Sequence, residues 1–195
     1  MLSWICECSY AICGFSVIVR PSKDIVARGE MTQQHYRTAD LYDAHGEDLA
    51  ICEPGLRDFG GHAGFHGRIH TVKCFEDNSL VRQALEQPVQ GDVLVVDAGG
   101  SMRCAMLGDQ LATIAVDNGW SGIVMYGCIR DSADIANMPV GVKALATHPA
   151  KSNKHGVGEK DMPVTFCGVR FTPGGYLYAD SDGIVVSDTE LMRPD

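Results

Sequence analysis

Three charged side chains have the types and the spacing that a divalent-metal reaction needs. Asp109 is followed, after twenty intervening residues, by the adjacent pair Arg130 and Asp131. A carboxylate such as Asp131 is a hard oxygen ligand of the kind that Mg²⁺ binds, with water filling the remaining positions. Arg130 offers a planar fork for a carboxylate or enolate oxygen. Asp109 is placed to hold a water and pass a proton.

Two predicted strands must position these residues. Val93–Asp97 and Gly122–Tyr126 are short apolar runs that predict buried strands. A helical pattern lies between them, beginning at Gly108-Asp109 and ending at Asn118-Gly119. Strand, helix and strand in this order predict parallel pairing through a helical crossover. Ligands bind beyond the carboxyl ends of parallel strands, so we expect the two following loops to form one site.

The helix start near Gly108 suits a bound carboxylate, because it presents unpaired N–H groups and a positive dipole end. Simpler alternatives exist for each residue. Asp109 could serve only as a helix cap, and Arg130 with Asp131 only as a surface ion pair of little energetic weight. The spacing itself arises by chance in about one of fifteen chains of this composition. The position on two strand-end loops therefore carries more of the hypothesis than the spacing does.

Other groups of polar residues point to structure rather than chemistry. His62, His66 and His70 are spaced four apart, but the glycines and the alternation around them predict loop and strand, not a metal-binding helix face. The basic stretch 148–160 is interpreted as a solvated connection. Asp180-Ser181-Asp182-Gly183 lacks the later ligands of a calcium loop and predicts a turn.

Composition limits the classes of function. The chain has 195 residues, an apolar fraction of 45% and a net charge of −9, which predict a globular domain that does not bind nucleic acid directly. The cysteines lie in or beside apolar runs, as reduced buried thiols do, so we expect a cytoplasmic protein. Cys128 stands beside the candidate site without a His partner and is not predicted to be a nucleophile.

Residues 1–30 differ from the rest of the chain. This stretch is apolar up to Val19 and its basic residues follow the apolar run, which is not the order of a signal peptide. Our interpretation is an extension that is disordered or lies upstream of a functional start at Met31, with residues 31–195 as the domain. A membrane anchor is the alternative, although the run barely reaches the length of a span.

The remaining pattern predicts a single α/β domain with mixed strand pairing. Helices are expected at residues 38–44, with Thr38 or Asp40 as cap, and at 79–87. Strands are expected at residues 68–74, 140–147, 162–171, 176–179 and 184–186.

A resemblance to a known family is carried by Phe59-Gly60-Gly61, Thr71–Asn78, Val93–Asp97 with Gly99-Gly100, Tyr126-Gly127 and Leu177–Asp180. Over residues 38–187 the chain resembles the RraA-like family, which comprises regulators of ribonuclease E activity and class II 4-hydroxy-4-methyl-2-oxoglutarate aldolases. The aldolase branch carries the spacing found here in Asp109, Arg130 and Asp131, whereas the enterobacterial type of regulator lacks the Arg-Asp pair. The stretch Cys74–Asn78 is closer to the regulators.

The resemblance implies a β/β/α swivelling-domain fold with a mixed sheet and an enzyme that cleaves a carbon–carbon bond in a small 2-oxo acid. Pyruvate would be released, with oxaloacetate decarboxylation as a side activity. It implies that the backbone of Gly108-Asp109-Gln110-Leu111 and the side chain of Arg130 bind the substrate. Asp131 would hold Mg²⁺ or Mn²⁺, and Asp109 would handle the proton.

The resemblance also implies a homotrimer or a dimer of trimers, with the site at a subunit interface and an acidic residue supplied by the neighbour. The alternative function is inhibition of ribonuclease E, or of an associated helicase, by direct binding. An acidic surface suits a basic partner segment, and the two functions are compatible.

Overall fold

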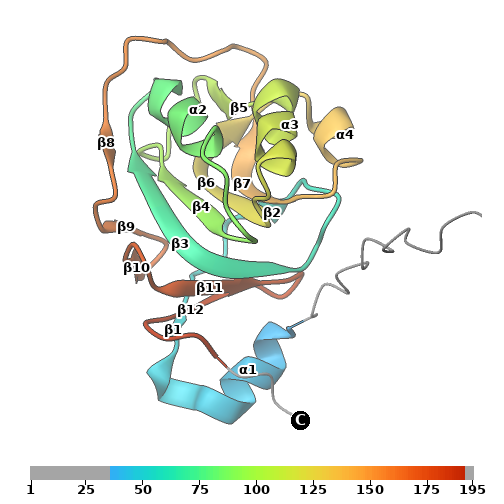
Figure 1. The fold of residues 1–195 in the computed structure, drawn as a ribbon, viewed down its shortest axis with the longest axis vertical. Helices are drawn as coiled ribbons and strands as arrows, with labels where there is room; N and C mark the ends of the chain where they lie inside the picture. Colours follow the sequence, from blue (N-terminus) through green and yellow to red (C-terminus); the bar gives the residue numbers. More distant parts are fainter. Residues whose placement is uncertain (1–35, 192–195) are drawn as a thin grey trace, which may run out of the picture. The chain divides into compact units, whose positions relative to one another are not determined.

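The computed structural model describes residues 36–191, so the predictions for residues 1–30 and for a start at Met31 fall outside the described part of the chain. A curled, mixed sheet of ten strands is central to residues 36–191, in the order β1-β12-β11-β3-β4-β6-β7-β2, with β5 added to β6 and β8 added to β3 (Figure 1). The strands are Ala50–Ile51 (β1), Arg57–Asp58 (β2), Phe65–Lys73 (β3), Val93–Asp97 (β4), Ala105–Leu107 (β5), Gly122–Ile129 (β6), Gly141–Thr147 (β7), Glu159–Lys160 (β8), Val164–Phe166 (β9), Val169–Phe171 (β10), Tyr176–Ala179 (β11) and Ile184–Ser187 (β12). The helices are Thr38–His45 (α1), Gly46–Asp48 (a 3₁₀ turn), Ser79–Leu85 (α2), Asp109–Asp117 (α3) and Ser132–Ile135 (α4).

Four neighbouring strands, β3, β4, β6 and β7, run parallel to one another. The predicted parallel pairing of Val93–Asp97 with the strand that begins at Gly122 is confirmed, and Val93 faces Gly122 in the register. Helices α2 and α3 cover one face of these strands (Figure 1), where Leu94 and Val96 join the larger apolar core. Val93 and Val95 point to the opposite face and pack into a second core with β11 and β12. The predicted mixed α/β architecture is confirmed.

One aromatic ring determines which residues β6 and β7 can carry at their starts. The ring of Phe65 lies directly over Gly122 and Gly141, and a Cβ at either glycine would collide with it. Phe65 is only 3% exposed and cannot swing into solvent without opening the second core. The absence of two side chains is therefore what allows β3 to cross the starts of both strands.

Several predicted boundaries are wrong in informative ways. The strand predicted over residues 162–171 is the hairpin β9–β10, which turns at Cys167-Gly168 with both residues at positive φ. Strand β6 continues beyond Tyr126 to Ile129, so Arg130 follows the strand directly. The short elements β5 and α4 were not predicted, and both border the candidate site.

Helix α1 is held by a residue far away in the sequence. Neither Thr38 nor Asp40 caps it with a side chain; instead the Thr38 N–H and hydroxyl both donate to the buried carboxylate of Asp180, each at 2.7 Å. Asp180 also accepts from the N–H groups of Asp182 and Gly183, so the predicted turn at 180–183 is confirmed. Burial alone would raise the pKa of Asp180, but these donors together lower it below its ordinary value.

Among residues 36–191, no helix is long and apolar enough to cross a membrane.

The Phe65 contact predicts an overpacking effect. Gly122→Ala should lower the free energy of unfolding by about 1–3 kcal/mol, because the added methyl group meets a ring that has no room to move. Urea denaturation followed by circular dichroism measures the change. Gly183→Ala is the matched control, since no atom lies within 4 Å of the added Cβ. Equal midpoints for the two variants would contradict the argument, and Phe65→Leu should recover part of the loss in the Gly122→Ala background.

Candidate active site

The two predicted strand-end loops meet at the carboxyl edge of the parallel strands. Arg130 Nε lies 3.2 Å from Asp131 Oδ2, and the Asp109 N–H points at the same oxygen from 3.4 Å. A Cβ at Gly108 would lie 2.8 Å from Asp131 Oδ2 and 3.1 Å from Arg130 Nε. The Arg130–Asp131 pair thus packs directly over the bare backbone of Gly108, which explains why this position carries no side chain.

Strand β5 brings the two loops together. It pairs in parallel with the end of β6, where Ala105 faces Cys128. The Arg130 N–H donates to the Leu107 carbonyl at 2.9 Å, which continues this pairing by one residue. Gly108 is therefore held beside Arg130 by backbone hydrogen bonds rather than by side chains.

Asp131 has a left-handed backbone, with φ 54° and ψ 36°. Asp and Asn tolerate this conformation better than most other residues. The Asp131 carbonyl accepts from the N–H groups of Asp134 and Ile135, both at 3.1 Å, and so begins α4. The side chain is 34% exposed and therefore remains accessible to a ligand.

The first turn of α3 offers fewer free N–H groups than the sequence implied. The Leu111 and Ala112 N–H groups donate to the Gly108 carbonyl at 3.1 and 3.0 Å. Helix geometry leaves Asp109 and Gln110 without such partners, and the Asp109 N–H makes only the long contact with Asp131. Of the four residues expected to bind through their backbone, Leu111 uses its N–H within the helix, whereas Asp109 and Gln110 keep N–H groups available for a ligand.

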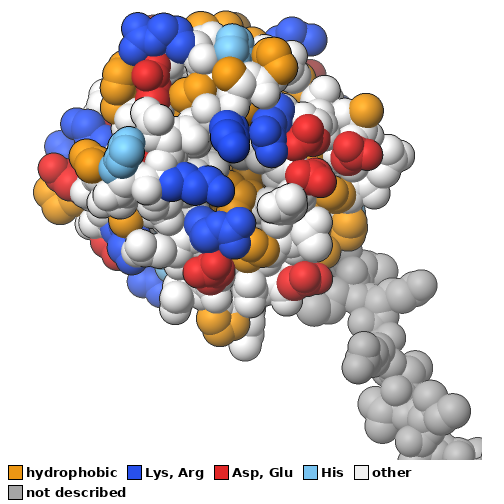
Figure 2. All heavy atoms as spheres, turned by 90° about the horizontal axis from the view of Figure 1, so that it is seen from above, with side chains coloured by type: hydrophobic (Ala, Val, Ile, Leu, Met, Phe, Trp, Pro, Cys, Tyr) orange, Lys and Arg blue, Asp and Glu red, His pale blue; other side chains and the backbone are white. Residues whose placement is uncertain are grey.

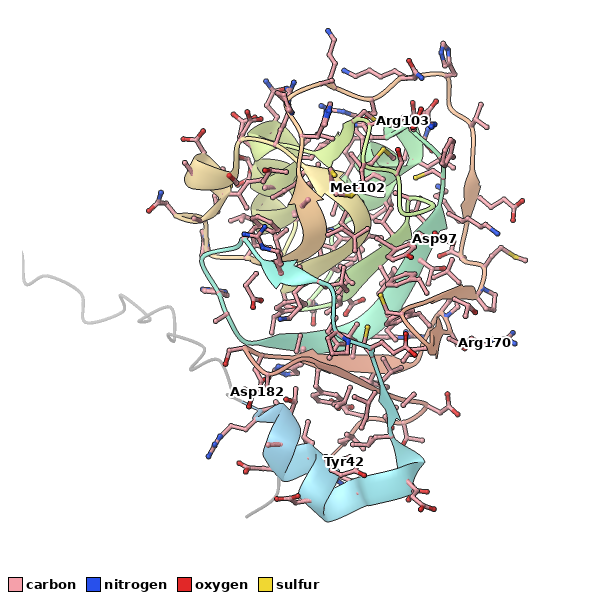
Figure 3. The ribbon with its side chains drawn as sticks, turned by 180° about the vertical axis from the view of Figure 1, so that it is seen from behind. Tyr42, Asp97, Met102, Arg103, Arg170 and Asp182 are labelled. Atoms are coloured by element: carbon pink, nitrogen blue, oxygen red, sulfur yellow. The ribbon has the colours of Figure 1, made fainter. Side chains whose placement is uncertain are left out.

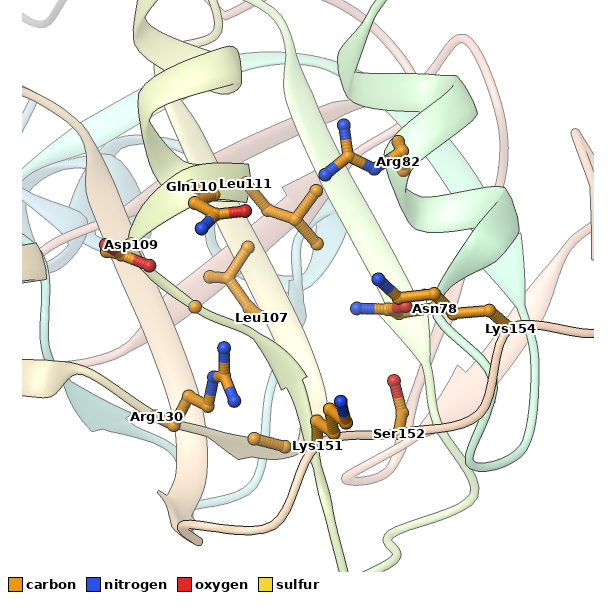
Figure 4. A pocket seen from close by; sticks show the side chains of 12 residues that line it. Asn78, Arg82, Leu107, Asp109, Gln110, Leu111, Arg130, Lys151, Ser152 and Lys154 are labelled. Carbon is orange, nitrogen blue, oxygen red and sulfur yellow. The ribbon is translucent and has the colours of Figure 1, made fainter.

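One side of a small pocket of about 60 Å³ is lined by Arg130 and by residues Gly108 to Leu111 (Figure 4). The opposite side is formed by Asn78 and Arg82 of α2 and its leading turn, and by Lys151, Ser152 and Lys154. The lining as a whole contains four cationic side chains and one carboxylate, Asp109. Figure 2 looks onto this end of the protein and shows Lys and Arg side chains gathered on it.

The segment after β7 is largely exposed, as predicted for a solvated connection, but it also borders the pocket. It passes over the carboxyl edge (Figure 1) and supplies three of the pocket residues, Lys151, Ser152 and Lys154. A signal for this was available in the sequence. The segment follows a strand parallel to β6, so the rule that placed Arg130 and Asp131 at this edge also applies to it.

One buried carboxylate fixes this segment to α2. Asp77 is 2% exposed and accepts from the Ser79 N–H at 2.9 Å, from the Val157 N–H at 3.5 Å, and from the His155 N–H. Burial alone would raise the Asp77 pKa, but these N–H donors together lower it to about 2. The wall of the pocket thus depends on a carboxylate that stays ionised at any ordinary pH.

Two histidines that were not predicted to bind a metal, His66 and His70, have structural partners. The His66 ring lies 4.5 Å from the ring of Tyr36, centroid to centroid, and His70 Nε2 lies 2.6 Å from Asp92 Oδ2. Within residues 36–191, no group of three or more His, Cys, Asp or Glu side chains is arranged to hold a metal. Burial raises the pKa of the Cys128 thiol, which does not favour a nucleophilic role.

Comparisons with known proteins agree on one family. A family model described as RraA-like, Aldolase/RraA, matches residues 38–186. A Laribacter hongkongensis protein named "Putative 4-hydroxy-4-methyl-2-oxoglutarate aldolase" is 58% identical over 157 residues, which cover 80% of this chain and 99% of the relative.

Two solved structures share the fold and much of the sequence. The RNA-processing inhibitor RraA from Thermus thermophilus superposes with a TM-score of 0.77 at 44% identity, covering 80% of this chain and 94% of that one. A Geobacillus kaustophilus structure named as an S-adenosylmethionine:2-dimethylmenaquinone methyltransferase gives a TM-score of 0.78 at 52% identity, covering 80% of this chain and 96% of that one.

Asp77→Asn should loosen the pocket wall, because an amide NH₂ would face the N–H groups that the carboxylate now accepts. Hydrogen exchange measured by mass spectrometry should show faster exchange at residues 153–157, with little change in the sheet. Asp97→Asn is the control, since Asp97 caps only its own turn through the Gly99 N–H.

In the native protein the pKa of Asp77 lies below its ordinary 3.8, so the protection should persist above pH 4 and fall as the pH drops toward 2. Equal exchange in both variants would contradict this role.

Proposed function

This chain belongs to the RraA-like family, and from that membership we propose that it is a divalent-metal-dependent 4-hydroxy-4-methyl-2-oxoglutarate aldolase that releases pyruvate. The observation that carries the proposal is the meeting of Arg130, Asp131 and Asp109 over Gly108, at the mouth of a cationic pocket. An acyl-enzyme or thiol mechanism has less support, because the Cys128 thiol, two residues before Arg130, is buried and its pKa is raised.

The oxygen donors at the site fit a hard cation. Asp131 would hold it, and Asp109 stands beside it to hold a water. Mg²⁺ and Mn²⁺ are bound by one or two carboxylates together with waters and substrate oxygens, and need no cage of three or more protein ligands. When bound, such a cation stabilises negative charge on the oxygen next to the bond that breaks.

The protein's own groups would bind and orient the substrate. The N–H groups of Asp109 and Gln110, at the positive end of α3, suit the C1 carboxylate. Arg130 suits the 2-oxo oxygen, where charge grows as the C3–C4 bond breaks. A water held by Asp109 would accept the C4 hydroxyl proton in that step and would return a proton to C3 afterwards, so that the proton balance closes. Oxaloacetate decarboxylation leaves the same charge on C3 and is the expected side activity.

The pocket charge disfavours transfer of a methyl group from S-adenosylmethionine. That donor carries a sulfonium and an ammonium group against one carboxylate, so it is a cation at neutral pH. Four cationic side chains and one carboxylate line the pocket, so it would repel such a donor.

We also propose that the protein is a cytoplasmic homotrimer or dimer of trimers, as in the family it resembles. Two exposed apolar side chains at the same edge of the sheet as the site support a subunit contact. Phe75 is 57% exposed and Met102 is 52% exposed, and the Arg103 guanidinium lies 5.6 Å from the centre of the Phe75 ring. Figure 3 labels Met102 and Arg103. Both exposed side chains come from loops at the carboxyl edge, so a neighbour packed there would contribute to the site.

Asp131→Asn should lower pyruvate release by about 100-fold or more, because it removes the charge of the proposed metal ligand while keeping a residue that tolerates the left-handed backbone. A coupled lactate dehydrogenase assay with Mg²⁺ measures the rate, and EDTA should abolish it in the native protein. Asp134→Asn, one helical turn further on, is the control and should retain activity. Turnover that resists both EDTA and Asp131→Asn would refute the aldolase proposal.

A second candidate is inhibition of ribonuclease E by direct binding. The 44% identity to the Thermus RNA-processing inhibitor favours it, and the net charge of −9 suits a basic partner segment. A pull-down with the C-terminal region of ribonuclease E should retain the protein at physiological salt and release it at high salt. Asp131→Asn should bind as well as the native protein, since the surface is otherwise the same. No retention at physiological salt would count against this function.

A further inference from the structure

Two cysteines outside the candidate active site lie against each other. Cys52 and Cys167 both pack in the second apolar core, and the Cys52 thiol is hydrogen-bonded to the sulfur of Cys167. Both are free thiols, and Cys167 is the only cysteine within residues 36–191 that is not fully buried. Two adjacent thiols, one of them reachable from solvent, have what reversible disulfide chemistry needs.

Backbone hydrogen bonds hold the two cysteines side by side. The Cys52 N–H donates to the Ile184 carbonyl at 3.0 Å, which continues the pairing of β1 with β12. The next N–H, that of Glu53, donates to the Cys167 carbonyl at 2.8 Å, so the chain after β1 runs along the turn of the β9–β10 hairpin. The two sulfur atoms therefore need only a short approach to form a bond, and the sheet does not have to open.

Cys167 occupies a turn position that seldom carries a cysteine. It is the first of the two residues that join β9 to β10, Cys167 and Gly168, whose φ angles are 48° and 73°. Turns of this kind favour Asn, Asp or Gly at the first position, because most other side chains are strained at positive φ. A strained residue points to a use for its side chain, and here that side chain contacts Cys52.

The surroundings keep both thiols protonated under ordinary conditions. Burial is the largest influence, and it raises the pKa of Cys52 to about 12 and the pKa of Cys167 above its ordinary value. The hydrogen bond from Cys52 acts in the opposite direction on the Cys167 pKa, because it stabilises the Cys167 thiolate. The thiolate is the reactive form of a cysteine, so Cys167 is placed to react first with an oxidant and Cys52 to react second.

We propose that Cys52 and Cys167 form a reversible disulfide when a hydroperoxide accumulates, and that this bond locks the β9–β10 hairpin to the segment after β1. The inference is independent of the proposed aldolase function. In a reducing compartment such a bond is transient, because low-molecular-weight thiols reverse it by thiol–disulfide exchange.

The oxidation proceeds in two balanced steps. The Cys167 thiolate attacks the O–O bond of hydrogen peroxide, which leaves a sulfenic acid on Cys167 and a hydroxide that takes up the thiol proton as water. The Cys52 sulfur then attacks the sulfenic sulfur, the S–S bond forms, and the sulfenic oxygen leaves as a second water with the Cys52 proton. Two thiols and one peroxide thus give one disulfide and two waters, with the sulfur atoms oxidised and the peroxide reduced.

The lock should stabilise the folded protein. The bond closes a loop of about 115 residues, and a long closed loop removes many conformations from the unfolded chain. It also fixes a hairpin that contributes to the core, since the Phe166 ring stacks on Tyr126 of β6 with the ring centroids 4.7 Å apart. Oxidation should therefore raise Tm by roughly 10 °C, and dithiothreitol should return it to the starting value.

The test treats the full-length protein with hydrogen peroxide, blocks the remaining thiols with iodoacetamide and maps crosslinked peptides by mass spectrometry, with Tm measured by scanning calorimetry. The native protein should give a peptide pair joined through Cys52 and Cys167 together with the rise in Tm. Cys167→Ser should give neither. Cys104→Ser, which removes a buried thiol outside the pair, is the matched control and should give both.

A trapping experiment checks the order of the steps. In Cys52→Ala the sulfenic acid on Cys167 has no second thiol to meet, so dimedone should label Cys167 after peroxide treatment, whereas the native protein should be labelled several-fold less. The absence of a Cys52–Cys167 crosslink in the oxidised native protein would overturn the proposal. A rise in Tm that survives in Cys167→Ser, or a crosslink that leaves Tm unchanged, would overturn the lock.

Discussion

Parallel pairing of β3, β4, β6 and β7 is the constraint on which the site depends. Because all four strands run the same way, the segment that follows each of them emerges at one edge of the sheet. Cys74–Asn78, the glycine loop after Asp97, the Arg130–Asp131 pair and the segment beyond Thr147 therefore converge, although they are spread over about 80 residues of chain. The two apolar cores on either face of these strands supply the burial that keeps this edge rigid.

At that edge the chain uses backbone and buried charge rather than exposed side chains to set positions. The Arg130 N–H to Leu107 carbonyl bond places Gly108 under the Arg130–Asp131 pair, and any side chain at Gly108 would push the pair away. On the opposite side of the pocket, the ionised carboxylate of Asp77 fixes the positions, because it joins α2 to the segment beyond β7. Both arrangements leave the groups that face the pocket free to meet a ligand, since the positioning bonds are made by other atoms.

The pocket lining is positively charged, although the chain as a whole is negatively charged. A net charge of −9 opposes the approach of polyanions in general, whereas four cations around one carboxylate produce a positive potential in a single place. Charge patterning of this kind connects the acidic surface that suits a basic protein partner with a site that suits a 2-oxo acid, so one fold can support both roles.

The sequence by itself determined the strands Val93–Asp97 and the run from Gly122, the helix that begins at Asp109, and the two loops that carry the charged trio, because short-range hydrophobic periodicity and glycine positions specify such elements. Tertiary structure alone decided that Asp180 would cap α1 and that β6 would continue to Ile129. It also decided that Phe65 would need bare glycines at 122 and 141, and that Lys151, Ser152 and Lys154 would face Arg130 across a pocket. Each of these depends on groups far apart in the sequence, up to 142 residues for Thr38 and Asp180, whose contacts carry no local pattern and form only when the parallel sheet closes.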